Sequence, residues 1–312
     1  TKRLKMTTAL ISDPSCRRHD MGPAHPESPR RLDVITDMLM TLRVLDMLSH
    51  FDAPAVTREQ LLRIHTPGYL DWLESIVPES GYRDIDLDTR LTPKTLPAAR
   101  KAAGAAVLAT DLVLSGKFEN AFCQVRPPGH HATADRAMGF CFYNNVAIGA
   151  AHAMEEHGLE RVAILDFDVH HGNGTDAIFD DDDRVLFCSL FQEGLFPLVD
   201  GHSTCSNGVY VALPSGSGGD EMRNAIDKSW LPALWAFRPQ MIFVSAGFDA
   251  HVMDDMSDLA FSDADFQWFT ERVTDAAREH CSGRLVSILE GGYDLDSLAR
   301  CVAAHVKSLS RL

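Results

Sequence analysis

Short, nearly continuous apolar runs recur along the chain and are separated by longer segments of helical character. The runs are rich in β-branched and aromatic residues and lack the apolar–polar alternation of a half-exposed strand. This pattern is typical of strands covered on both faces and predicts a mostly parallel sheet. We expect strands at Thr8–Ser12, Ala121–Val125, Arg161–Phe167, Val185–Leu190, Val209–Leu213, Met241–Ser245 and Leu285–Leu289.

The segments between these runs predict helices. Pro97–Ser115 is rich in Ala, begins with a Pro and ends before Gly116, which are common start and stop signals. Asn145–Glu156 and Phe266–His280 show the spacing of amphipathic helices. Strand and helix alternate over the whole length without an internal repeat or a long linker, which predicts one doubly wound α/β domain.

Charge and cysteine content narrow the class of protein. The 312 residues include 29 Lys and Arg against 44 Asp and Glu, a net charge of −15. This balance argues against direct binding to nucleic acid or to an anionic membrane. Seven Cys without a Cys-x-x-Cys pair indicate free thiols, so we expect a cytoplasmic protein. Met6 is a candidate for the natural initiator. We expect a catalytic domain over residues 6–312, with residues 1–5 as a non-native extension.

Unusual polar motifs follow directly after predicted strands. They are RPPGHHA (126–132), DFDVHHGNGT (166–175), SAGFDAH (245–251) and EGGYD (290–294). In an open parallel sheet, ligands bind outside the carboxyl ends of the strands. We therefore expect these motifs to meet in one crevice.

Two carboxylates and one imidazole form a candidate metal site. Asp168 and His170 are two residues apart on an extended segment and so share a face, and Asp249 comes from another strand end. Three protein ligands with an open fourth position are typical of a catalytic metal site. The set suits Zn²⁺, and less exclusively Fe²⁺ or Co²⁺. Taken singly, a capping Asp or a loop His is the commoner role; their convergence on one sheet edge favours the metal.

The remaining motif residues predict hydrolysis. His130 and His131 can divide general base and general acid catalysis, with Asp166 orienting one ring and Asn173 as a candidate partner of the other. Tyr293, after two glycines, can donate to a developing oxyanion. Together they indicate metal-assisted hydrolysis of a carbonyl compound with metal-bound water as the nucleophile. The chain has no G-x-S-x-G, H-E-x-x-H or phosphate-loop motif.

With GFCFYNN (139–145) and HPESPRRL (25–32), these motifs resemble the zinc-dependent histone deacetylase superfamily. The Asn pair at 144–145 and Asn173 resemble the class II branch and its bacterial relatives. The resemblance implies an arginase/deacetylase-like α/β fold with a central eight-stranded parallel sheet flanked by helices. It also implies hydrolysis of an acyl amide, typically N-ε-acetyl-lysine in a protein or peptide.

The resemblance implies three groups of site residues. The catalytic group consists of His130, His131 and Tyr293, with Asp166 behind the His pair. The group lining a substrate tunnel consists of Gly139, Phe140, Phe196 and Met256. The metal ligands are Asp168, His170 and Asp249 for zinc, and Asp166, Asp168, His170, Ser189 and Leu190 for a structural potassium ion. Arg31 matches a residue near an internal acetate-release channel.

Two classes of substrate are compatible with the sequence: acyl-lysine and an acylated polyamine. Some relatives that prefer polyamines place an acidic residue at the position of Met256, whose apolar side chain favours acyl-lysine. Alignment on Pro93 places Leu91 where peptide deacetylases grip the substrate backbone, with Asp88 three residues earlier. We expect an acetylated lysine peptide or protein as partner, with a small acylated amine as the alternative; an oligomer is compatible with the sequence. A non-catalytic scaffold would lack one of these residues, and all are present.

Overall fold

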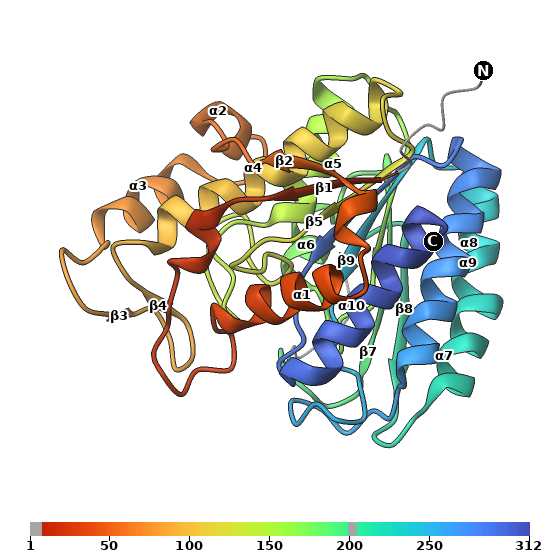
Figure 1. Ribbon diagram of the computed structural model, residues 1–312. Helices are drawn as coiled ribbons and strands as arrows, with labels where there is room; N and C mark the ends of the chain where they lie inside the picture. The colour runs from red at the N-terminus through yellow and green to blue at the C-terminus, as the bar shows by residue number, and fades with distance from the viewer. Residues whose placement is uncertain (1–7, 199–204) are drawn as a thin grey trace.

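A single parallel sheet forms the centre of the computed structural model, which describes residues 8–198 and 205–312 (Figure 1). Met6 and residues 1–5 lie outside the described ranges. The eight strands are ordered β2-β1-β5-β10-β9-β6-β7-β8 and are all paired in parallel. Their bounds are β1 Thr8–Ser12, β2 Ser49–Asp52, β5 Asn120–Cys123, β6 Val162–Asp166, β7 Val185–Gln192, β8 Gly208–Leu213, β9 Met241–Ala246 and β10 Leu285–Leu289.

Helices cover both faces of the sheet (Figure 1). Helices α4 and α5 pack together, and α10 packs between α1 and α9. The bounds are α1 Arg30–Thr41, α2 Arg58–Leu61, α3 Pro67–Ser75, α4 Thr95–Leu114, α5 Asn145–Glu155, α6 Asn173–Ile178, α7 Gly219–Ala225, α8 Leu231–Phe237, α9 Asp263–Cys281 and α10 Leu295–Ser310. A two-stranded hairpin, β3 (Arg83–Asp84) with β4 (Arg90–Leu91), lies apart from the sheet. Within the described ranges, no helix has the length and apolar character needed to cross a bilayer.

The fold predictions are largely confirmed. All seven expected strands and the three expected helices are present; β1 and β10 have the predicted ends, and the ends of the others are shifted. Helix α9 begins earlier than predicted because Ser262 and Asp265 form a capping box at its first turn. The expectation of coverage on both faces is wrong for β8, which is half-exposed at one edge of the sheet. The eighth strand, β2, forms the other edge.

The strand order explains why the polar motifs meet. Each motif follows one of β5, β10, β9 and β6, and these four strands are consecutive in the middle of the sheet. Since all four run in the same direction, their carboxyl ends lie side by side. The crevice predicted from the sequence therefore lies beyond the carboxyl ends of the central strands.

Candidate active site

Asp168, His170 and Asp249 come together beyond the ends of β6 and β9. One ligand atom from each lies within 4.8 Å of the others, and all three side chains are buried. His170 Nδ1 lies 3.0 Å from Asp168 Oδ1 and 3.3 Å from Asp249 Oδ2. Backbone N–H groups hold the far oxygens: Gly291 donates to Asp168 Oδ2 at 2.8 Å, and Val169 donates to Asp249 Oδ1 at 3.0 Å. The three groups are therefore fixed before any ligand arrives.

The electrostatics of this cluster fit a divalent cation. Burial opposes a charged imidazole, but the hydrogen bond to Asp168 and the nearby Asp249 carboxylate prevail and raise the pKa of His170 to about 10. Asp249 Oδ2 is buried and, in the described part of the chain, has no hydrogen bond of good geometry. A Cβ on Gly291 would lie only 2.0 Å from this oxygen, so a glycine is needed here for the backbone to approach the cluster this closely. Two carboxylates and one imidazole, with one buried carboxylate oxygen left without a hydrogen-bond partner among the described residues, match the donors of a zinc site.

The two adjacent histidines have different partners. His130 Nδ1 donates to the Asp166 carboxylate at 2.9 Å, and His131 Nδ1 donates to the Asn173 amide oxygen at 2.8 Å. Burial disfavours charge on both rings, but Asp166 and Asp168 raise the pKa of His130 well above its usual value. Burial and the neighbouring His130 lower the pKa of His131 well below its usual value. With Nδ1–H engaged, His131 Nε2 keeps a free lone pair and can accept a proton.

Tyr293 is held at its backbone as well as at its ring. The carbonyl of Gly292 accepts a hydrogen bond from Arg31 Nε at 2.6 Å, and the Arg31 guanidinium carbon lies 5.0 Å from the centre of the Tyr293 ring. Burial and the Asp249 charge raise the pKa of the Tyr293 phenol well above its usual value. The phenol therefore stays protonated and can act as a hydrogen-bond donor at neutral pH.

A narrow cavity of about 100 Å³ leads to these groups. Phe140 and Phe196 both line it, and the Phe196 ring centre lies 5.0 Å from that of His131. Gly139 lies between them with φ +54°, and a Cβ there would come within 2.5 Å of the His131 ring and 2.9 Å of Phe196. The full lining is Asp88, Pro128, His130, His131, Gly139, Phe140, His170, Phe196, Met256, Gly291 and Tyr293.

The mouth of this cavity corrects one prediction. Leu91, expected to meet the substrate backbone, is fully buried and does not line the cavity. Asp88 does line it, together with Met256, and both also border an adjoining groove of about 430 Å³. Asp88 belongs to the turn between β3 and β4, whereas Leu91 is the last residue of β4, so an alignment on Pro93 alone selects the wrong residue.

The potassium residues predicted from the resemblance lie on neighbouring strands. Asp166 at the end of β6 is in register with Ser189 on β7, and Leu190 follows. Ser189 Oγ lies 3.0 Å from His171 Nδ1. These residues lie next to the zinc candidates in the sheet, and the potassium site stays a prediction.

Two other groups of potential metal ligands are engaged differently: Asp111, His152 and His157, and His251, Asp263 and Cys301. Arg63 donates to His152 Nδ1 at 2.9 Å, so His152 Nε2 carries the proton that Asp111 accepts. Met253 N–H donates to His251 Nδ1 at 3.0 Å, so His251 Nε2 carries the proton that Asp263 accepts. Both ring nitrogens of His152, and both of His251, are therefore engaged with other protein groups.

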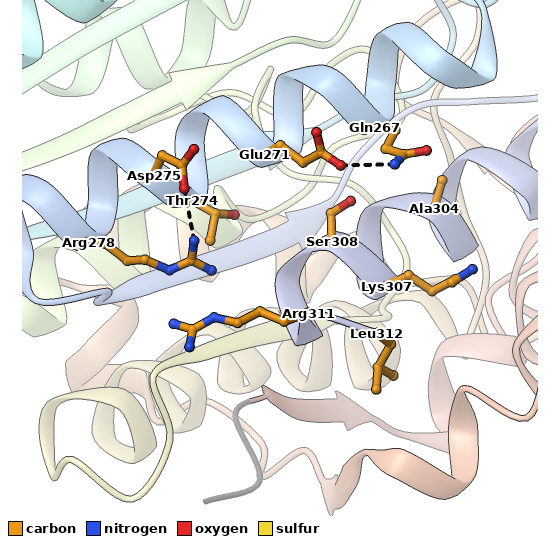
Figure 2. A pocket seen from close by; sticks show the side chains of 10 residues that line it. All are labelled: Gln267, Glu271, Thr274, Asp275, Arg278, Ala304, Lys307, Ser308, Arg311 and Leu312. Carbon is orange, nitrogen blue, oxygen red and sulfur yellow. Dashed lines mark hydrogen bonds and ion pairs between the residues drawn. The ribbon is translucent and has the colours of Figure 1, made fainter.

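A larger hollow of about 390 Å³ lies between α9 and α10 (Figure 2). It shares no lining residue with the narrow cavity. Side chains of its lining bond to one another along α9: Gln267 donates to Glu271 and Arg278 donates to Asp275, each at 2.9 Å. It shows the features of a groove between packed helices and not of a binding site.

One residue of the site was not assigned a role from the sequence. Glu290, at the end of β10, accepts hydrogen bonds from the backbone N–H groups of Gly129 at 2.6 Å and His130 at 3.2 Å. It is fully buried, and burial raises its pKa to about 7. Glu290 thus holds the loop that carries the His pair. A Glu directly after a buried apolar strand was the available signal.

Fold and side chains together define an α/β protein with a candidate metal centre for hydrolysis. Residues 25–309 match the model of the histone deacetylase domain. The chain belongs to the histone deacetylase family. This membership supports deacetylase activity, that is, the activity of a hydrolase that cleaves an amide.

The relatives come from several kingdoms. The histone deacetylase-like amidohydrolase of Pseudomonas aeruginosa is 38% identical over 97% of this chain and 86% of that protein. A probable deacetylase of Archaeoglobus fulgidus is 37% identical over 93% of this chain and 82% of that protein. The crystal structure of the HDA15 HD domain matches with a TM-score of 0.90 and 32% identity, over 98% of this chain and 88% of that one.

Proposed function

We propose that the protein is a zinc-dependent amidohydrolase that removes acetyl and related acyl groups from the Nε of lysine in proteins or peptides. One observation supports this most. A narrow, aromatic-walled cavity ends on a His pair and a Tyr phenol, directly beside a buried Asp–His–Asp cluster. Such a cavity suits a long thin stem with a carbonyl at its tip.

The Asp168–His170–Asp249 cluster is the proposed zinc site. Zinc held there would supply a Lewis acid that polarises the acyl carbonyl and makes water more acidic. We further propose that Asp166, Asp168, His170, Ser189 and Leu190 hold a structural potassium ion. We also propose that the protein is related to class II members and their bacterial relatives, and that it is cytoplasmic. The seven free, buried cysteines support that location.

The protein side chains would divide the proton transfers. His131, neutral and hydrogen-bonded through Nδ1 to Asn173, would take a proton from the attacking water at Nε2. The same atom would then deliver that proton to the departing lysine amine. His130, paired with Asp166, would remain cationic and stabilise the negative charge that develops at the carbonyl. The Tyr293 phenol would donate a hydrogen bond to the carbonyl oxygen as the tetrahedral intermediate forms.

Substrate choice would be made at the cavity mouth. Phe140 and Phe196 would hold the apolar part of the lysine side chain between their rings. Asp88, which lines the cavity, would accept backbone N–H groups of a peptide. The same carboxylate also suits a cationic amine, and this observation keeps deacetylation of a small acylated polyamine as the second candidate. Met256 offers no charge to such a substrate, which favours the peptide.

A comparison of kcat/KM on zinc-loaded enzyme tests the proposal. The substrates are an N-ε-acetyl-lysine peptide and N-acetylspermidine, and we expect the peptide to be the better one. Asp249→Asn should lower the activity on the order of 100-fold or more. Asp255→Asn is the matched control, because it removes the same charge from an exposed position in the same loop. Absence of hydrolysis of both substrates, or equal activity in the two variants, would refute the assignment.

A further variant separates the two substrate classes. Met256→Glu adds a carboxylate at the rim of the cavity and should raise the ratio of acetylspermidine to peptide turnover several-fold. An unchanged ratio would show that position 256 does not contact the part of the substrate that carries charge.

A further inference from the structure

Asp254 is a buried carboxylate in the loop after β9, and its contacts lead to the active-site tyrosine. Its side chain is almost inaccessible, with an exposed fraction of 4% for the residue. Oδ2 accepts the backbone N–H of Tyr293 at 2.6 Å and that of Asp294 at 3.0 Å. Oδ1 accepts the backbone N–H of Met256 at 3.1 Å. One carboxylate thus connects the proposed oxyanion donor with the rim of the cavity.

The peptide unit before Tyr293 is held at both ends. Its carbonyl, on Gly292, accepts from Arg31, and its N–H donates to Asp254. Gly291 and Gly292 precede the tyrosine, and Gly292 has φ +113°, so the local backbone is intrinsically permissive. Contacts from outside the loop must therefore set the direction in which the tyrosine side chain leaves the backbone.

On its other side, the tyrosine is fixed to a helix. Asp294 is the N-cap of α10, and its side chain accepts the N–H of Ser297 at 2.8 Å. Asp254 therefore binds the segment where a flexible glycine turn becomes a rigid helix. A shift of this junction would move the Tyr293 phenol relative to the His pair.

The contact pattern requires a carboxylate at position 254. All three N–H groups face oxygens, and in the described part of the chain no basic side chain forms an ion pair with Asp254. An Asn would direct its NH₂ group at a backbone N–H in either orientation of the amide, because only one of its two terminal atoms accepts. Burial raises the pKa of Asp254 to about 6. Burial thus disfavours the ionised carboxylate, and the hydrogen bonds from the three N–H groups partly offset this desolvation cost.

We infer that Asp254 is a positioning residue, which orients the Tyr293 phenol through the backbone N–H groups of Tyr293 and Asp294. The inference rests on the proposed function, in which Tyr293 stabilises the oxyanion. Asp254 acts on the transition state through Tyr293, so its loss should lower kcat and leave KM nearly unchanged. A misplacement of about 1 Å can cost on the order of 100-fold in rate.

A double-mutant cycle separates positioning from a general structural role. In metal-loaded enzyme, Asp254→Asn should lower kcat by roughly 10- to 100-fold. Asp255→Asn, the adjacent exposed carboxylate, should leave it unchanged. In a Tyr293→Phe background, Asp254→Asn should have little further effect, because the group that it positions is gone. Equal losses in both backgrounds, or a loss confined to KM, would overturn the inference.

Hydrogen exchange provides a readout that does not depend on turnover. The amides of Tyr293 and Asp294 should exchange faster in Asp254→Asn than in wild type, with the strands unchanged. If wild type hydrolyses no acyl substrate, the proposed function fails, while the exchange rates still test the contact. If Asp254→Asn does not fold, Asp254→Glu serves instead: it keeps both oxygens on a longer stem that displaces the loop, and it should lower kcat relative to wild type with KM nearly unchanged. Unchanged amide exchange, or full activity in the Glu variant, would refute the positioning role.

Discussion

Replacing Glu27 by Gln should destabilise the protein strongly, although Glu27 does not line the active-site cavity. Its carboxylate forms paired hydrogen bonds with the guanidinium of Arg126, one of them at 2.5 Å, and accepts from Arg31 at 3.1 Å. All three side chains are fully buried. In the Gln variant, an NH₂ group replaces one acceptor and two buried guanidinium groups lose their counter-charge. Breaking a buried ion pair from one side costs about 3–5 kcal/mol.

The pKa of Glu27 provides a second route to this magnitude. Burial alone would raise it, but Arg126 and then Arg31 lower it from 4.5 to about 2. Each unit corresponds to about 1.4 kcal/mol, which gives about 3 kcal/mol for the ionised form. Since the folded-state pKa lies below the unfolded value, this stabilisation is complete above the unfolded pKa and is lost as the pH falls toward 2.

Chemical denaturation at neutral pH measures the effect, with Asp33→Asn as the control. Asp33 pairs with Arg17 at 2.7 Å but is half-exposed, so its pair should contribute about 0–1 kcal/mol. Glu27→Gln should also lower Tm by about 5–10 °C. A free energy of unfolding within about 1 kcal/mol of the control would refute the idea that the buried cluster depends on this charge.

Three further predictions follow from the site. Gly139→Ala should abolish turnover while the fold persists, because the added methyl meets His131 and Phe196; normal kcat in the variant would contradict the cavity geometry. Zinc added to metal-free protein at 100 times its Kd should stabilise it by about 2.7 kcal/mol, seen as a higher Tm, and Asp168→Ala should remove this shift. Phe140→Ala should raise KM for an acetyl-lysine peptide several-fold in steady-state kinetics, since one aromatic wall is lost; an unchanged KM would place the lysine stem elsewhere.

The sequence was sufficient to predict the centre of the fold because the central strands are covered on both faces. Strands such as β6 and β9 are fully buried, so their residues are almost all apolar. Strand β2 was missed because it is a short edge strand, Ser-His-Phe-Asp, whose side chains alternate in exposure. Edge strands face solvent on one side, and their sequences lose the continuous apolar signal.

Site residues were predictable where they share a short motif and less so where loops meet. Asp168 and His170 are neighbours on one strand end, so the sequence places them together. The sequence alignment placed Leu91 at the cavity mouth, where the structure has Asp88 from the β3–β4 turn. The contact between Asp254 and Tyr293 joins two loops that only tertiary packing brings together. Side-chain contacts between distant loops leave no periodic trace in the sequence, and only the structure shows them.

The strand order has a consequence for how the protein becomes active. The site is assembled from β5, β6, β9 and β10, and β10, late in the chain, lies between β5 and β9. No partial sheet built from the first three of these strands can be continuous, because its middle position is filled last in sequence. Such non-local pairing slows folding, since distant segments must close before they are stabilised. Enzymatic activity should therefore report completed folding, and a chain that stops before Leu285 should lack both the sheet and the site.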